Sequence, residues 1–91
     1  MIPRYAARRD TTEADIILAL EQMGFHVEQI SAPGIPDLIL SRAGQWYLAE
    51  CKTGKGRLTK AQAVFHSAAR ASIPILRTVE QAIEWARRLD R

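Results

Sequence analysis

Two apolar segments separated by a short turn sequence constrain the fold of this chain most. Residues 37–41 and 46–52 are rich in Leu, Ile, Trp and Tyr, and residues 42–45 between them read Arg-Ala-Gly-Gln. Such segments predict two β-strands, and Ala43-Gly44 predicts a two-residue hairpin turn. That turn places position 39 opposite 48, and position 37 opposite 50. Because both segments are apolar on both faces, we expect a sheet that is covered on each side.

The remaining segments predict three helices and two shorter strands. Helical spacing of apolar residues predicts a helix from residue 11 to Gly24. Two more helices are expected to begin after Thr59 and Thr78, because each threonine precedes a glutamine by three residues, as in a capping box. Short apolar stretches at residues 25–30 and 73–76 predict strands. The expected apolar sides are Val64, Phe65 and Ala68 in the second helix, and Val79, Ala82, Ile83, Ala86 and Leu89 in the third.

The order αβββαβα predicts an α/β fold with a mixed sheet flanked by helices. The chain of 91 residues has room for one small domain. We expect that domain to span residues 11–91, behind a basic arm at residues 1–10.

Composition narrows the classes of protein to which the chain can belong. The 13 Lys and Arg residues against 10 Asp and Glu permit nucleic acid as a partner without establishing it. A single cysteine excludes an internal disulfide and is typical of a reducing cytoplasm. No apolar run has the length of a membrane span or of a secretory signal, so no membrane partner is expected.

Acidic and basic side chains converge at one end of the expected hairpin. Asp37 lies opposite Glu50, with Cβ atoms about 5 Å apart, and Lys52 follows on the same face as Glu50. Two carboxylates this close repel each other unless one holds a proton or a cation lies between them. Mg²⁺ suits that position, because it binds a few carboxylates and completes its shell with water and phosphate oxygens. With a lysine to orient water or offset phosphate charge, the set is suited to metal-assisted phosphodiester hydrolysis.

The same three residues also have a simpler interpretation, a cross-strand salt bridge between Lys52 and one carboxylate at an exposed sheet edge. Spacing alone does not distinguish the two. The two histidines, His26 and His66, are too isolated in the sequence to form a metal site, and we expect each to be structural or exposed. The large aromatic residues Trp46, Trp85 and Phe65 are expected in the core or at an interface.

A resemblance to a known family favours the catalytic interpretation. The sequence Gly-Ile-Pro-Asp that ends at Asp37, followed by Glu-Cys-Lys at 50–52, resembles the PD-(D/E)xK nuclease signature. More narrowly, the chain resembles the VRR-NUC (virus-type replication–repair nuclease) domain, with an acidic residue early in the first helix and Leu-Thr-Lys-Ala-Gln at 58–62. The resemblance covers nearly the whole chain. It implies a restriction-endonuclease-like core and a Mg²⁺- or Mn²⁺-dependent deoxyribonuclease.

The resemblance also implies the roles of individual residues at the acidic end of the hairpin. Asp37 and Glu50 are the implied metal ligands, and the backbone carbonyl of Cys51 is an implied third ligand. Lys52 is the implied catalytic lysine. Cysteine replaces the aliphatic residue that is more usual in the middle of this triplet, and it leaves the mechanism intact.

Two further residues match the family pattern and also have local explanations. Glu13 matches the acidic residue of the family's first helix, where it would bind metal through water or a second ion, but a carboxylate in a first helical turn also suits the helix dipole. Gln62 matches the family's glutamine near the site, but it also completes the capping box of Thr59. The two roles of Gln62 can coexist.

A Gly-rich basic loop at residues 53–58 follows the triplet. It lacks the Walker pattern, so no nucleotide cofactor is expected. Beside a metal site, basic side chains are suited to binding DNA phosphates. Gly34 would let a phosphate or a backbone segment approach closely. The candidates for phosphate binding are Lys55, Arg57 and Lys60, with Arg8, Arg9 and Arg42 as weaker ones.

The expected function is structure-specific DNA cleavage. Stand-alone members of the resembled family are similar to homodimeric resolvases of four-way junctions, and a two-fold dimer suits a roughly two-fold Holliday junction. A protein of this kind is expected in the cytoplasm of a bacterial or phage-infected cell. Two alternatives remain open: a nuclease of other specificity (flap, single-strand or nicking), and a catalytically silent DNA-binding module.

Overall fold

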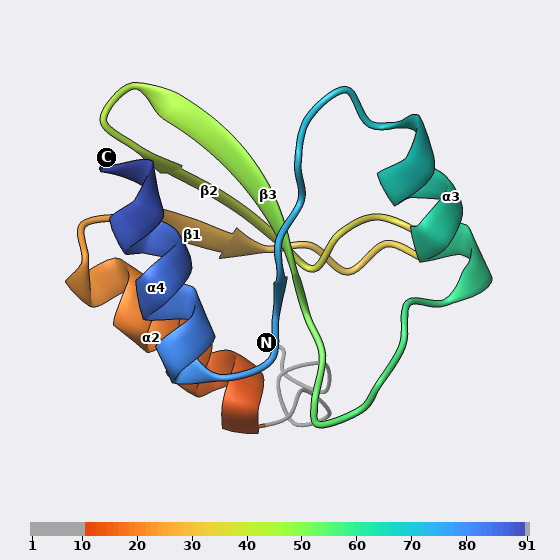
Figure 1. The fold of residues 1–91 in the computed structure, drawn as a ribbon, viewed down its shortest axis with the longest axis horizontal. Coiled ribbons are helices and arrows are strands. Elements are labelled where there is room, and N and C mark those ends of the chain that lie inside the picture. Colours follow the sequence, from red (N-terminus) through yellow and green to blue (C-terminus); the bar gives the residue numbers. More distant parts are fainter. Residues whose placement is uncertain (1–10, 91) are drawn as a thin grey trace.

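The computed structural model of the chain describes residues 11–90 (Figure 1). Its helices and strands follow one another in the predicted order. They are α2 (Thr11–Gln22), β1 (His26–Gln29), β2 (Leu38–Arg42), β3 (Gln45–Cys51), α3 (Lys60–Ala68), β4 (Ile75–Leu76) and α4 (Val79–Leu89). The basic arm expected at residues 1–10, with Arg8 and Arg9, lies outside the described residues.

The strands form one mixed sheet in the order β1-β2-β3-β4. The first two pairings are antiparallel, and β3 pairs with β4 in parallel. The expected α/β fold with a mixed sheet is therefore confirmed. The hairpin register is confirmed as well, since Ile39 pairs with Leu48. Its turn has positive φ at both Ala43 (54°) and Gly44 (79°), as a type I′ turn requires.

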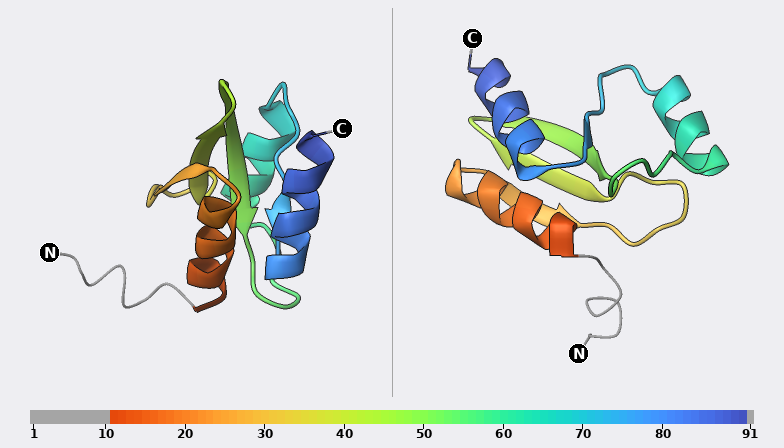
Figure 2. Two further views of the ribbon diagram at one scale, coloured as in Figure 1. Left: turned by 90° about the vertical axis from the view of Figure 1, so that its left-hand side faces the viewer. Right: turned by 60° about the horizontal axis from the view of Figure 1, so that its bottom comes forward.

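The hydrophobic core lies between one face of the sheet and helices α2 and α4, which run side by side (Figure 2). The sheet contributes Leu38, Leu40 and Ala49, all fully buried. An aromatic cluster closes this core, in which the ring of Trp85 lies 5.6 Å from that of Phe25 and 5.4 Å from that of Tyr47. Trp85 thus belongs to the core, one of the two positions that the sequence analysis allowed for it.

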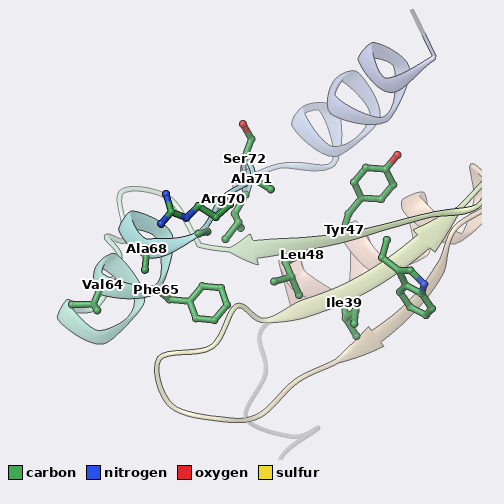
Figure 3. A pocket seen from close by; sticks show the side chains of 12 residues that line it. Ile39, Tyr47, Leu48, Val64, Phe65, Ala68, Arg70, Ala71 and Ser72 are labelled. Carbon is green, nitrogen blue, oxygen red and sulfur yellow. The ribbon is translucent and has the colours of Figure 1, made fainter.

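The expectation that the sheet is covered on each side is wrong for the second face. Helix α3 lies over the Glu50 end of β3 and leaves the opposite end of that strand open (Figure 1). Trp46 is 66% exposed and Val64, expected on the apolar side of its helix, is 64% exposed. Between α3 and the sheet lies a groove of about 740 Å³ lined mainly by apolar side chains (Figure 3).

The two later helices begin where the threonines predict, but only one has the full capping box. At α3, the backbone N–H of Gln62 donates to Thr59 Oγ1 (3.1 Å), and Gln62 Oε1 accepts from the N–H of Thr59 (2.9 Å). At α4, Thr78 Oγ1 accepts from the N–H of Gln81 (3.0 Å). The side chain of Gln81 instead accepts from the N–H of Arg77 (2.8 Å), so the second half of that box is replaced.

Candidate active site

The structure brings the carboxyl groups of Asp37 and Glu50 together at one end of the hairpin. Leu38 pairs with Ala49 as the last pair of β2 and β3, so Asp37 and Glu50 are the next residues in register. Asp37 Oδ2 accepts a hydrogen bond from the backbone N–H of Cys51 (2.9 Å). The two carboxyl groups are close enough for Asp37 to act on Glu50 and raise its pKa. This proximity is the one that the turn geometry predicts.

Glu50 is held from the other side by two residues of helix α3. Its side chain is fully buried, at 0% exposure. Gln62 Nε2 donates to Glu50 Oε1 (3.3 Å), and His66 Nε2 lies 3.3 Å from Glu50 Oε2. The sequence analysis assigned Gln62 to the site but set His66 aside as isolated. Residues four apart share one face of a helix, and this spacing from Gln62 is the signal that could have identified His66.

Burial and the neighbouring carboxyl group change the acidity of Glu50. Burial, the hydrogen bond to Asp37 and the charge of Asp37 raise the pKa of Glu50 from 4.5 to about 7. The positive charge of Lys52 acts in the opposite direction and lowers this pKa. The half-buried lysine, which directly follows β3, therefore acts on Glu50 through its charge. Around neutral pH, without a cation, the carboxyl pair retains a proton for part of the time.

Gln62 completes the predicted capping box and also contacts a carboxyl group of the candidate site. Its Oε1 caps helix α3 through the N–H of Thr59, and its Nε2 donates to Glu50. A single side chain therefore fixes the start of α3 relative to the buried carboxyl group.

Glu13 is buried on α2, with 7% of its surface exposed. Its Oε2 accepts a hydrogen bond from Gln29 Nε2 (3.3 Å) at the end of β1. The next residue along the chain, Ile30, donates its backbone N–H to the carbonyl of Asp37 (2.7 Å), which places this end of β1 beside Asp37. Glu13 thus lies at the Asp37 end of the sheet, and a side-chain hydrogen bond positions it in addition to the helix dipole.

A cavity of about 700 Å³ opens beside the carboxyl pair, between residues 30–37 and the start of α3. Asp37 and Gln62 both line it, so Asp37 is reached from this side. Gly34 shapes the same opening. Its φ is +79°, and a Cβ at this position would lie 3.0 Å from the Cβ of Ala61. The close approach that Gly34 permits is therefore to helix α3.

Three exposed basic residues lie after the site in sequence, on the loop that follows Lys52 and at the start of α3: Lys55, Arg57 and Lys60. The loop is tied to the end of β4, because Arg77 Nη1 donates to the carbonyls of Gly54 (3.0 Å) and Gly56 (2.6 Å). The sequence analysis did not single out Arg77. Its role depends on a contact across more than 20 residues that no local motif marks.

Arg42, the remaining described candidate for phosphate binding, lies at the opposite end of β2 from Asp37. Its guanidinium donates to the carbonyls of Met23 and Ala86 (3.2 Å each) and to Asp90 Oδ1 (2.7 Å). It also lies over the ring of Phe25, 4.4 Å from the centroid. We therefore assign Arg42 a structural role, which joins the hairpin to the ends of α2 and α4.

The donor set at the carboxyl pair fits a hard divalent cation that retains much of its water. The pair offers carboxylate oxygens, and burial together with the charge of Asp37 raises the pKa of Glu50 when no cation balances the charge. Within residues 11–90, no three His, Cys, Asp or Glu side chains form a group that could hold a metal ion. Such a pair suits Mg²⁺ or Mn²⁺, which bind through one or two carboxylates plus water and phosphate, and does not suit a cage built from protein ligands.

Comparison with known proteins gives no family assignment: no family model, curated protein or solved structure matches the chain. In the part of the chain that the structure covers, no helix combines the length and the apolar character needed to cross a bilayer.

Proposed function

We propose that the protein is a divalent-metal-dependent DNA endonuclease with a core of the PD-(D/E)xK type. The convergence of Asp37 and Glu50 in register at one end of the hairpin, beside Lys52, is the observation that carries the proposal. Asp37 and Glu50 would hold Mg²⁺ or Mn²⁺, together with the backbone carbonyl of Cys51. When bound, such an ion supplies a Lewis acid that activates water and balances charge on a phosphate.

The chain's own residues have separate tasks in this proposal. Lys52 offsets the negative charge that develops on the phosphate, or orients the attacking water, because its ammonium group acts on the same side of the sheet as Glu50. Gln62 fixes the carboxyl group of Glu50 from helix α3. Lys55, Arg57 and Lys60 bind backbone phosphates and position the strand without reading its sequence. Glu13 supports the Asp37 end of the site, through water or a second ion.

The alternative of a catalytically silent DNA-binding module is disfavoured by the same carboxyl pair. Carboxylates repel phosphates, so a domain that only binds DNA gains nothing from two of them at one end of the hairpin, where Asp37 lines an open cavity. A calorimetric titration with Mn²⁺ separates the two functions. A nuclease of this type binds Mn²⁺ and loses that binding in Asp37→Ala, whereas a silent module shows no such loss.

We expect the preferred substrate to be branched DNA. A domain of 80 residues, the part of the chain that the structure describes, offers little surface for contacting DNA bases. DNA shape is therefore the feature that it can recognise. With Mg²⁺ or Mn²⁺, cleavage of a mobile four-way junction should be faster than cleavage of a flap, a single strand or a plain duplex, as measured by gel assay at equal DNA concentration. Fastest cleavage of the flap or single strand would assign the other nuclease specificity. No cleavage of any of the four DNAs would contradict the proposal.

We also propose that two copies associate through the open face of the sheet. Trp46 and Val64, two of the three large hydrophobic side chains that are more than half exposed in residues 11–90, line the apolar groove between α3 and the sheet. Phe65 and Leu48 point into this groove (Figure 3). A projecting Trp beside a recess on one surface suits a two-fold interface, in which each copy presents both features to the other.

Trp46→Lys should therefore convert a dimer to a monomer in light scattering at micromolar concentration. Large aromatic residues at the centre of an interface contribute about 2 kcal/mol or more, so the dissociation constant should rise at least about 30-fold. Leu18→Lys is the matched control, since Leu18 is 54% exposed on α2 and does not line the groove. A wild-type protein that stays monomeric with and without DNA would refute the dimer.

A further inference from the structure

We infer that His66 is a positioning residue of the carboxyl site, which fixes the second oxygen of Glu50 while Gln62 fixes the first. The inference rests on the proposed function, because it concerns the geometry of a carboxylate that would bind metal. Its basis is a contact between elements that are separate in sequence. His66 Nε2 lies 3.3 Å from Glu50 Oε2, and the two side chains are 16% and 0% exposed.

The two contacts to Glu50 have different geometric consequences. The terminal torsion of a glutamate is broad, so one hydrogen bond leaves the carboxylate plane free to turn. Gln62 holds Oε1 and His66 holds Oε2. Together they define both the position and the plane of the group. Asp37 accepts a hydrogen bond of its own, from the backbone N–H of Cys51.

The position of α3 also argues for this role. The helix stands away from the sheet over an open apolar groove, and side-chain hydrogen bonds from Gln62 and His66 to Glu50 join it to the sheet. The helix therefore contacts the sheet through polar side chains at the candidate site. Groups that orient a metal-binding carboxylate affect metal affinity or activity by about 10- to 100-fold when they are removed.

The test compares His66→Leu with His66→Gln. Leucine removes the hydrogen bond, and glutamine offers a donor at similar reach. We expect His66→Leu to weaken Mn²⁺ binding in calorimetry by about 10-fold or more and to lower kcat on the four-way junction by a similar factor, with KM for the DNA unchanged. His66→Gln should restore most of both. Ser67→Leu, the same substitution at the exposed neighbouring position, should match wild type.

Nuclear magnetic resonance of the wild-type protein gives a second measurement that does not depend on a variant folding. Titration with Mg²⁺ should shift the ring nitrogen resonances of His66 and leave those of His26, on β1, unchanged. Unchanged His66 resonances at a Mg²⁺ concentration that saturates the site, or His66→Leu with wild-type Mn²⁺ affinity, would overturn the inference and leave the proposed function standing. A wild-type protein that neither binds Mn²⁺ nor cleaves DNA would instead remove the proposed function, and this inference with it.

Discussion

Lys52→Ala should lower the rate of DNA cleavage by about 10²- to 10³-fold, the usual cost of removing one group that stabilises charge in a transition state. The lysine directly follows β3, and its charge lowers the pKa of Glu50. Its task in the proposed reaction is confined to the phosphate and the attacking water. The loss should therefore appear in kcat, in single-turnover cleavage of a four-way junction with Mg²⁺ or Mn²⁺.

Two matched variants separate this role from simple loss of charge. Lys55→Ala removes the same charge from the exposed loop, so it should weaken DNA binding and reduce its salt dependence with little effect on kcat. Asp37→Ala should abolish both cleavage and Mn²⁺ binding, whereas Lys52→Ala should still bind Mn²⁺. Equal kcat for Lys52→Ala and wild type would exclude the mechanism.

The pairing of Asp37 with Glu50 could be predicted because a hairpin turn determines the register of the two strands that it joins. Once Ala43 and Gly44 are identified as the turn, the pairing of every later residue is determined, and the two-residue period of a strand assigns each side chain to a face. Asp37 and Glu50 are six residues from the turn on each side, and the structure places them next to each other in register.

The position of α3 could not be predicted in this way. Apolar spacing indicates that a helix has an apolar side, but not whether that side meets the sheet or solvent. Val64 belongs to the expected apolar side and is 64% exposed. His66 was missed for the same reason, since its contact with Glu50 depends on where the helix lies. Arg77 and Arg42 likewise have roles set by distant backbone carbonyls.

The unfolding free energy of the metal-free protein should fall as the pH rises from about 4.5 to about 7, because Glu50 has a raised pKa in the folded state. The folded protein binds this proton more tightly than the unfolded chain does, so the stability is fully present below pH 4.5 and is lost as the pH passes the folded-state pKa. Each tenfold change in acidity corresponds to about 1.4 kcal/mol, so the loss contributed by Glu50 is about 3 kcal/mol. Urea unfolding in EDTA at pH 5 and pH 8 measures it.

Glu50→Gln should remove most of this pH dependence, because the amide keeps similar shape and cannot ionise. At pH 8 in EDTA, the variant should be more stable than wild type. Glu21→Gln is the matched control, since it removes an exposed carboxylate on α2 and should keep the wild-type dependence. If wild type and the Glu21→Gln control each had the same unfolding free energy at pH 5 and pH 8, the result would contradict the burial and pairing of Glu50.

Mg²⁺ should act on wild type in the direction opposite to rising pH. A cation that binds the ionised carboxyl pair stabilises the folded state by an amount that grows with the ratio of its concentration to its dissociation constant. At pH 8, saturating Mg²⁺ should therefore restore much of the lost stability in wild type and little in Glu50→Gln. If Mg²⁺ stabilised both proteins equally, the cation would bind elsewhere, and the raised pKa of Glu50 would have no connection with metal binding.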